Sequence, residues 1–177
     1  EYDTLPGSYD DNGDVEQLVI YLKDRNYNLT LELHYYLYEK CDIITRSAKL
    51  VNSGNESVRL ERLMSMQLDL NESDYELSFF NGALAREMNR SRIPLRAGKY
   101  VNESVTGTSS NRANPFFMIG RSSTTEDYGE CYGFNLIYSG NHYEAAQVNS
   151  YGKLRLVSGI NPATFSYIIE VGKCFEA

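Results

Sequence analysis

The chain has 177 residues, 42% of them hydrophobic and 23% charged, which is enough for one domain with a sizeable core. Its formal net charge of -7 and pI near 4.9 argue against nucleic acid as a partner, because an acidic protein is repelled by phosphate backbones. No apolar run approaches the ~20 residues that a membrane-spanning helix needs, so we expect no membrane partner.

The first predicted strands form a hairpin near the start of the chain. In residues 16–24, Leu18, Ile20 and Leu22 alternate with other side chains. A longer alternation begins at residue 28 and continues to residue 38, with its leucines at every second position. A period of two places such residues on one face of a sheet, and the polar residues between the two runs suit a turn.

The next stretch, residues 57–70, alternates in two phases. Val58 and Leu60 set the first phase, and a second apolar set begins at Met64. The phase changes near Arg62. A change that keeps apolar residues on a core face predicts a β-bulge, or a bend of the chain from one sheet into another.

The remaining strands are expected near the end of the chain. Alternating or apolar runs between turn residues occur at 131–141, 143–148, 153–160 and 165–171. Residues 81–127 show little alternation, so we expect irregular backbone there, which in a compact domain is functional or packed against a partner. The fold class predicted is therefore all-β, an antiparallel β-sandwich.

The most specific feature of the irregular stretch is GTSSNRANPF, residues 107–116. Its small polar side chains can form local hydrogen bonds, Pro115 favours an extended Asn114, and the two phenylalanines that follow are expected to enter the core. The segment is either a rigid loop across one end of the sandwich or a docking surface for another domain. The candidate docking residues are Thr108, Ser109, Ser110, Asn111, Asn114, Pro115 and Phe116.

Catalytic and cofactor signals are weak. A glycosidase needs two carboxyl groups facing each other across a sugar. The candidates lie inside alternating strands on the polar face, where we expect solvated surface: Glu32, Glu61, Asp69 and Glu144. The only histidines, His34 and His142, lack the neighbours of a metal site, and no GxSxG motif or phosphate-binding loop is found. We predict no cofactor and no metal.

The cysteines and asparagines bear on the compartment. Cys41, Cys131 and Cys174 are an odd number at irregular spacings, which favours a reducing cytosol over a disulfide framework. Five Asn-X-Ser/Thr sequons begin at Asn28, Asn55, Asn71, Asn89 and Asn102. Chance explains them at least as well as glycosylation does.

The order of motifs is more informative than any one of them. CDIITRSAKLVNSG, RLERLMSMQLDL, YELSFFNGALARE, GTSSNRANPF, GECYGFNLIYSGN and GINPATFSYIIEVGKCF follow one another from about Leu5 onward. In this order they resemble the amino-terminal domain of bacterial α-galactosidases of glycoside hydrolase family 36. The chain departs from the family at Leu84, where Trp is frequent, and at Asn111, where His is frequent. These departures put in doubt any contact that the two positions make with a neighbouring domain.

The resemblance implies a galactose-mutarotase-like supersandwich, of which residues 1–177 are one domain fragment, incomplete at its amino-terminal side. Such a domain precedes a (β/α)8 barrel that holds both catalytic aspartates. The implied role is a non-catalytic domain of a retaining α-galactosidase that acts on melibiose- or raffinose-type substrates. Its implied partners are the barrel of the same parent chain and further copies in an oligomer.

Two other functions remain open. One is a stand-alone carbohydrate-binding module or lectin-like domain, and the other is an interaction domain without a ligand. Sugar-binding faces commonly present exposed aromatic rings, often Trp. The chain has no Trp but 15 Tyr, which weakens the sugar-binding alternative without removing it.

Overall fold

The computed structural model describes residues 15–177, so the part of the predicted domain and of the family resemblance that covers residues 1–14 lies outside the described residues. The described chain consists mainly of antiparallel strands, which confirms the predicted all-β sandwich class. Its helices, η1 (Glu39–Cys41) and η2 (Pro162–Thr164), are single turns, and no helix among residues 15–177 is long and apolar enough to cross a membrane.

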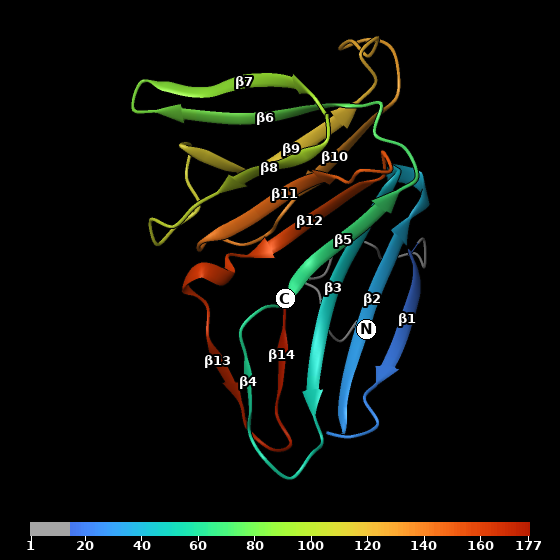
Figure 1. Cartoon of the computed structure of the whole chain (residues 1–177), viewed down its shortest axis with the longest axis vertical. Helices are drawn as coiled ribbons and strands as arrows, with labels where there is room; N and C mark the ends of the chain where they lie inside the picture. Colours follow the sequence, from blue (N-terminus) through green and yellow to red (C-terminus); the bar gives the residue numbers. More distant parts are fainter. Residues whose placement is uncertain (1–14) are drawn as a thin grey trace. The chain divides into compact units, whose positions relative to one another are not determined.

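The chain divides into two compact units (Figure 1). Unit 1 contains the residues up to Glu61 together with residues 166–177, and unit 2 contains residues 62–165. The strands of unit 1 are β1 (Val15–Lys23), β2 (Leu29–Tyr38), β3 (Ile43–Asn52), β4 (Val58–Leu60), β13 (Tyr167–Ile169) and β14 (Cys174–Glu176). Those of unit 2 are β5 (Met64–Leu70), β6 (Glu76–Ala83), β7 (Arg86–Pro94), β8 (Gly98–Glu103), β9 (Ala113–Gly120), β10 (Cys131–Asn135), β11 (His142–Val148) and β12 (Leu154–Ile160).

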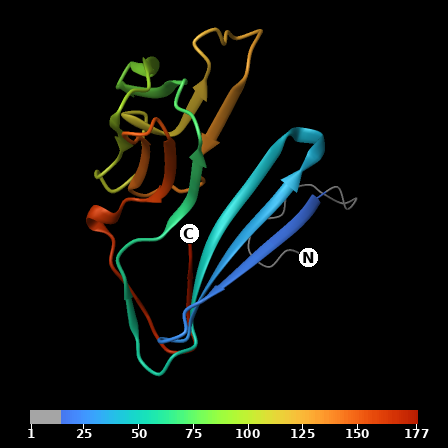
Figure 2. The same ribbon diagram turned by 45° about the vertical axis from the view of Figure 1, so that its right-hand side comes forward.

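The predicted hairpin of unit 1 is present as β1 and β2. The two strands are paired from Val15↔Tyr38 to Lys23↔Thr30, and β3 and β14 extend the sheet in the order β1-β2-β3-β14. Figure 2 shows the three long strands side by side in blue to cyan. In the turn, the carboxylate of Asp24 accepts hydrogen bonds from two main-chain N–H groups, which lower the pKa of that carboxyl.

The leucines of this hairpin share one face, as the alternation predicted, but that face is not a closed core. We call it the leucine face: Leu18, Ile20 and Leu22 of β1, paired with Tyr35, Leu33 and Leu31 of β2. Leu18 is 57% exposed, and Ile20 and Leu22 are also exposed. On the opposite face of β2, His34 and Tyr36 are buried instead. An apolar sheet face of this kind usually packs against something else.

Asn52 joins the two parts of unit 1 that are far apart in the sequence. Its side chain is buried at the end of β3, and its Nδ2 donates to the carbonyl of Glu56 at 2.8 Å and to that of Ile169 at 3.0 Å. The short ladder between β4 and β13 pairs Leu60 with Tyr167. The C-terminal segment is thereby built into unit 1.

Unit 2 is a sandwich of two four-stranded sheets, ordered β10-β9-β6-β7 and β5-β12-β11-β8. Its core draws side chains from both sheets: Leu77, Phe117 and Ile119 from the first, and Ala146, Val148, Leu154 and Leu156 from the second, with Tyr75 and Leu95 from the connections. Ile119 and Leu156 are fully buried, so the centre of each sheet supplies the core.

At the phase change near Arg62 the chain passes from one sheet to another, which was one of the two predicted alternatives. The short strand β4 ends at Leu60 and pairs with β13, whereas β5 begins at Met64 and pairs with β12. The three residues between them belong to no strand. The two phases therefore serve two different sheets.

The expectation of irregular backbone at residues 81–127 is wrong for most of the stretch. It contains β7, β8 and β9. Strands β7 and β8 are edge strands with mostly exposed side chains, so they carry little apolar alternation. Strand β9 is central and carries a nearly continuous apolar run. Alternation marks a strand only when one face is buried and the other is not.

Candidate functional site

The predicted docking segment connects β8 to β9 and is fastened to the chain that leaves β10. Ser109 donates from its main-chain N to the carbonyl of Ser139 at 2.9 Å and from its hydroxyl to the carbonyl of Tyr138 at 3.1 Å. The hydroxyl of Thr108 also donates to Ser139 O, at 3.0 Å. These hydroxyls are therefore already used inside the chain.

The other polar residues of the segment lie beside the β6–β7 hairpin. Nδ2 of Asn111 donates to the carboxylate of Glu87 at 3.4 Å, and Nδ2 of Asn114 lies 3.5 Å from the sulfur of Met88. The hydroxyl of Ser110 accepts a bond from the main-chain N of residue 112. In Figure 1 the β6–β7 turn and the connection from β8 to β9 lie on the same side of unit 2.

Only one of the two phenylalanines enters the core, which corrects the prediction that both do. Phe117 is 2% exposed and stacks on Phe134 with ring centroids 4.8 Å apart. Phe116 is half-buried and contacts Phe80 at a centroid distance of 5.7 Å. Successive side chains of a strand point to opposite faces, so both could not enter one core. Pro115 anchors the strand through its carbonyl, which accepts from the main-chain N of Leu136.

Sequence reasoning did not include the tip of the β6–β7 hairpin in the site. Leu84 at this tip is 92% exposed, and Met88 is exposed as well. The structure brings both positions at which the chain departs from the family, Leu84 and Asn111, to this end of unit 2. We call the residues 108–111 with Leu84, Met88 and Asn114 the candidate docking surface. The hairpin was missed because β7 is an edge strand without apolar alternation.

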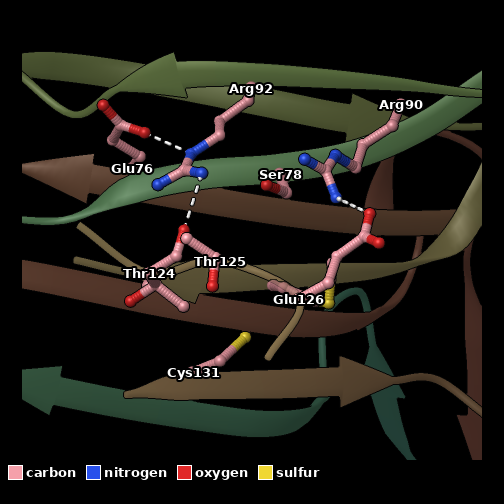
Figure 3. Close-up of a pocket in the computed structure, with 10 residues that line it drawn as sticks. Glu76, Ser78, Arg90, Arg92, Thr124, Thr125, Glu126 and Cys131 are labelled. Carbon is pink, nitrogen blue, oxygen red and sulfur yellow. Dashed lines mark hydrogen bonds and ion pairs between the residues drawn. The ribbon is translucent and has the colours of Figure 1, made fainter. Parts of the chain in front are cut away.

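A groove of about 260 Å³ lies under the loop of residues 121–130, against β6, β7 and β9 (Figure 3). Arg92 crosses it, pairs with Glu76 and donates to three main-chain carbonyls of the loop at 2.9 to 3.1 Å. Arg90 pairs with Glu126 at 3.5 Å. Both arginines of β7 bind residues of the loop, so they attach the loop to the sheet.

Glu144 was expected to be solvated, and the structure contradicts this. The residue is 2% exposed, because β11 is a central strand whose two faces are both covered. Burial raises the pKa of the Glu144 carboxyl to about 8, against a smaller lowering by the hydrogen bond from Asn102. His142, two positions earlier, is fully buried, and burial lowers the pKa of its imidazole.

The other candidate carboxylates make ordinary surface contacts. Asp69 accepts two bonds from the guanidinium of Arg155, at 2.6 and 2.8 Å, and these lower the pKa of the carboxyl. Glu32 contacts Lys49 at 3.6 Å, and Glu61 is exposed. Among residues 15–177, no group of three His, Cys, Asp or Glu side chains is arranged to hold a metal ion.

Comparison with protein families gives one match that covers nearly the whole chain. The model of the glycosyl hydrolase family 36 N-terminal domain matches residues 1–170. Among curated proteins, α-galactosidase AgaA of Geobacillus stearothermophilus is 38% identical over 173 residues, which is 97% of this chain and 24% of AgaA. α-Galactosidase 2 of Hypocrea jecorina is 34% identical, over 98% of this chain and 23% of that protein.

Solved structures agree. The α-galactosidase of Lactobacillus brevis matches with a TM-score of 0.94 and 38% identity, covering 99% of this chain and 24% of that one. A variant of AgaA in complex with raffinose matches with a TM-score of 0.90 and 38% identity, covering 92% and 23%. The chain therefore spans about a quarter of the length of these relatives.

Proposed function

Because the chain belongs to the family of glycosyl hydrolase family 36 N-terminal domains, we propose that it is the non-catalytic amino-terminal domain of a larger α-galactosidase. The parent enzyme hydrolyses terminal α-galactosides such as melibiose and raffinose with retention, and its catalytic residues lie in a (β/α)8 barrel outside this chain. The observation that carries the proposal is coverage, since nearly all of this chain aligns with about a quarter of each relative.

The surroundings of the carboxyl groups support a non-catalytic role. A glycosidase needs two carboxyl groups about 5 Å apart for retention, or roughly 6.5 to 9.5 Å apart for inversion, on either side of a bound sugar. Here Asp69 is engaged by Arg155 and Glu76 by Arg92. Glu144 is buried between the sheets, where a sugar cannot reach it.

The role of the domain is packing, against the barrel of the same parent chain and between copies in an oligomer. The candidate docking surface supports this role. Its segment is held by the main-chain N and the hydroxyl of Ser109, which donate to the carbonyls of residues 139 and 138, while Leu84 and Met88 expose apolar side chains beside it. A fixed segment with apolar neighbours loses little entropy on binding. We place the parent in the cytosol, a compartment that suits three exposed and unpaired cysteines.

The test separates three functions. The chain is assayed for hydrolysis of an aryl α-galactoside, titrated with galactose, and mixed with a tagged remainder of the parent enzyme. We expect no turnover and no galactose binding. We also expect the chain to co-purify with the remainder and to restore the stability of the remainder. Turnover that disappears when a carboxylate of this chain is mutated would refute the non-catalytic assignment. Galactose binding without co-purification would instead favour the carbohydrate-binding module.

A further inference from the structure

Two buried polar side chains, Glu144 and His142, and the half-buried Asn102 lie directly behind the candidate docking surface. Nδ2 of Asn102 donates at 2.7 Å to the carboxyl of Glu144 and at 2.7 Å to the main-chain carbonyl of Asn114. Asn102 and Glu144 are neighbours on β8 and β11, and Asn114 lies on β9 of the facing sheet. This amide therefore joins the two sheets at the point where the docking segment becomes a strand.

His142 makes a second connection between the same elements. Its Nε2 lies 2.9 Å from the carbonyl of Ala113. A carbonyl oxygen can only accept, so Nε2 carries the proton. Burial lowers the pKa of the ring below its ordinary value, which favours the neutral imidazole. Two adjacent carbonyls at the start of β9, those of Ala113 and Asn114, are thus held by side chains of the other sheet.

The charged form of Glu144 is poorly stabilised at this position. Its Oε1 is buried without a hydrogen-bond partner. The groups around it supply no positive charge: on β11 burial lowers the pKa of the His142 imidazole, and β8 contributes the phenol of Tyr100 and, on its other face, the carboxylate of Glu103. From β12 comes the hydroxyl of Ser158, and β9 carries no charged residue.

We propose that Glu144 is a proton-linked clasp on the docking segment. The neutral carboxyl keeps Asn102 in place to hold the carbonyl of Asn114, whereas the ionised carboxyl draws water into this end of the sandwich and loosens residues 107–114. A buried carboxylate without a cation is so costly that hydration or local opening follows its ionisation. The clasp is a property of this chain and does not depend on the proposed docking role.

Trypsin provides a direct test, because Arg112 is exposed within the segment and Arg96 is exposed in the connection between β7 and β8. The ratio of cleavage after Arg112 to cleavage after Arg96 is measured at pH 7 and pH 9, so that the pH dependence of trypsin itself cancels. The ionised fraction of a group with a pKa near 8 rises from about one tenth to about nine tenths over this interval. The ratio should therefore increase several-fold in the wild-type chain.

Variants identify the responsible group. In Glu144→Gln the ratio should stay constant between pH 7 and pH 9, whereas Glu126→Gln, an exposed carboxylate in another loop, should behave as wild type. Asn102→Ala, which removes the bridge, should give a high ratio at both pH values. A constant ratio in the wild-type chain overturns the proposal even if a variant does not fold. An equal increase in Glu144→Gln and wild type also overturns it.

Discussion

Glu144 and Ser158 are directly paired across the β11–β12 ladder, and the Oε1 atom of one and the hydroxyl of the other are both buried without a hydrogen-bond partner. Each such atom has lost its water without a replacement, which costs about 1 to 3 kcal/mol per group. These two unsatisfied groups therefore lower the stability of this end of the sandwich.

Replacing Ser158 by Ala should leave the free energy of unfolding unchanged or raise it by about 1 kcal/mol, because an unsatisfied hydroxyl is removed. Urea unfolding measures the change. The matched control is Ser104→Ala: this serine is also buried, but its hydroxyl donates to the carbonyl of Thr108 at 2.6 Å, so stability should fall. Equal losses in the two variants would show that Ser158 has a partner, such as an internal water.

The stability of the chain should depend on pH through Glu144. Between its ordinary pKa of 4.5 and the folded value of about 8, the carboxyl is ionised in the unfolded chain and protonated in the folded one. The folded state then binds more protons, so stability falls as pH rises, at up to about 1.4 kcal/mol per pH unit. Glu144→Gln lacks this contribution and should exceed the stability of wild type by a few kcal/mol at pH 8, but by little at pH 5.

Urea midpoints at the two pH values measure this difference. His142 contributes the opposite dependence, since its lowered pKa costs stability as pH falls below 6.5. It is present in both proteins and cancels in the comparison. Parallel pH curves for wild type and Glu144→Gln would contradict the prediction.

The leucine face should make the isolated chain associate. Leu22→Lys places a charge on this face and should reduce both self-association and the binding of a dye for exposed apolar surface. Tyr21→Lys is the control, because Tyr21 is exposed on the opposite face of the same strand. Sedimentation at several concentrations measures association. A monodisperse wild-type chain, or equal effects of the two variants, would speak against the leucine face.

In the parent enzyme, alanine at both Ser110 and Asn114 should lower the melting temperature by more than alanine at the exposed residues Ser150 and Asn55. The expected loss is ~1 to 3 kcal/mol for each buried hydrogen bond with the neighbouring domain. In the isolated chain the same double change should cost little, because both side chains are only half-buried and their contacts are long. Equal losses of stability in the isolated chain and in the parent enzyme would indicate that the segment has a purely structural role.

Alternation predicted the strands that have one buried face, and it failed where this condition does not hold. The hairpin of β1 and β2 and the bend after Leu60 could be read from the sequence because their apolar period is visible. Strand β7 could not, since an edge strand with polar side chains looks like a loop. Long-range pairing, such as that of β4 with β13, leaves no mark in either segment alone.

The candidate site could be predicted only in part, because a sequence shows local patterns but not which segments the fold brings together. The segment 107–116 could be found from its composition and Pro115, but its neighbours could not, because the β6–β7 hairpin reaches it only through the fold. Glu144 was misjudged since a polar residue in an alternating strand normally faces water. Both faces of β11 are covered, which only the arrangement of the sheets reveals.

The division of unit 1 between the two parts of the chain sets an order of folding. Asn52 and Ile169 are 117 positions apart, and closing a loop of such length before other contacts form costs entropy that grows with its logarithm. Unit 2 is continuous in sequence, and its pairing of Met64 with Gly159 brings together the two chain segments that lead to β4 and β13. We therefore expect unit 2 to form before β13 pairs with β4, so pulse-labelled hydrogen exchange should protect β11 and β12 before it protects Ile169.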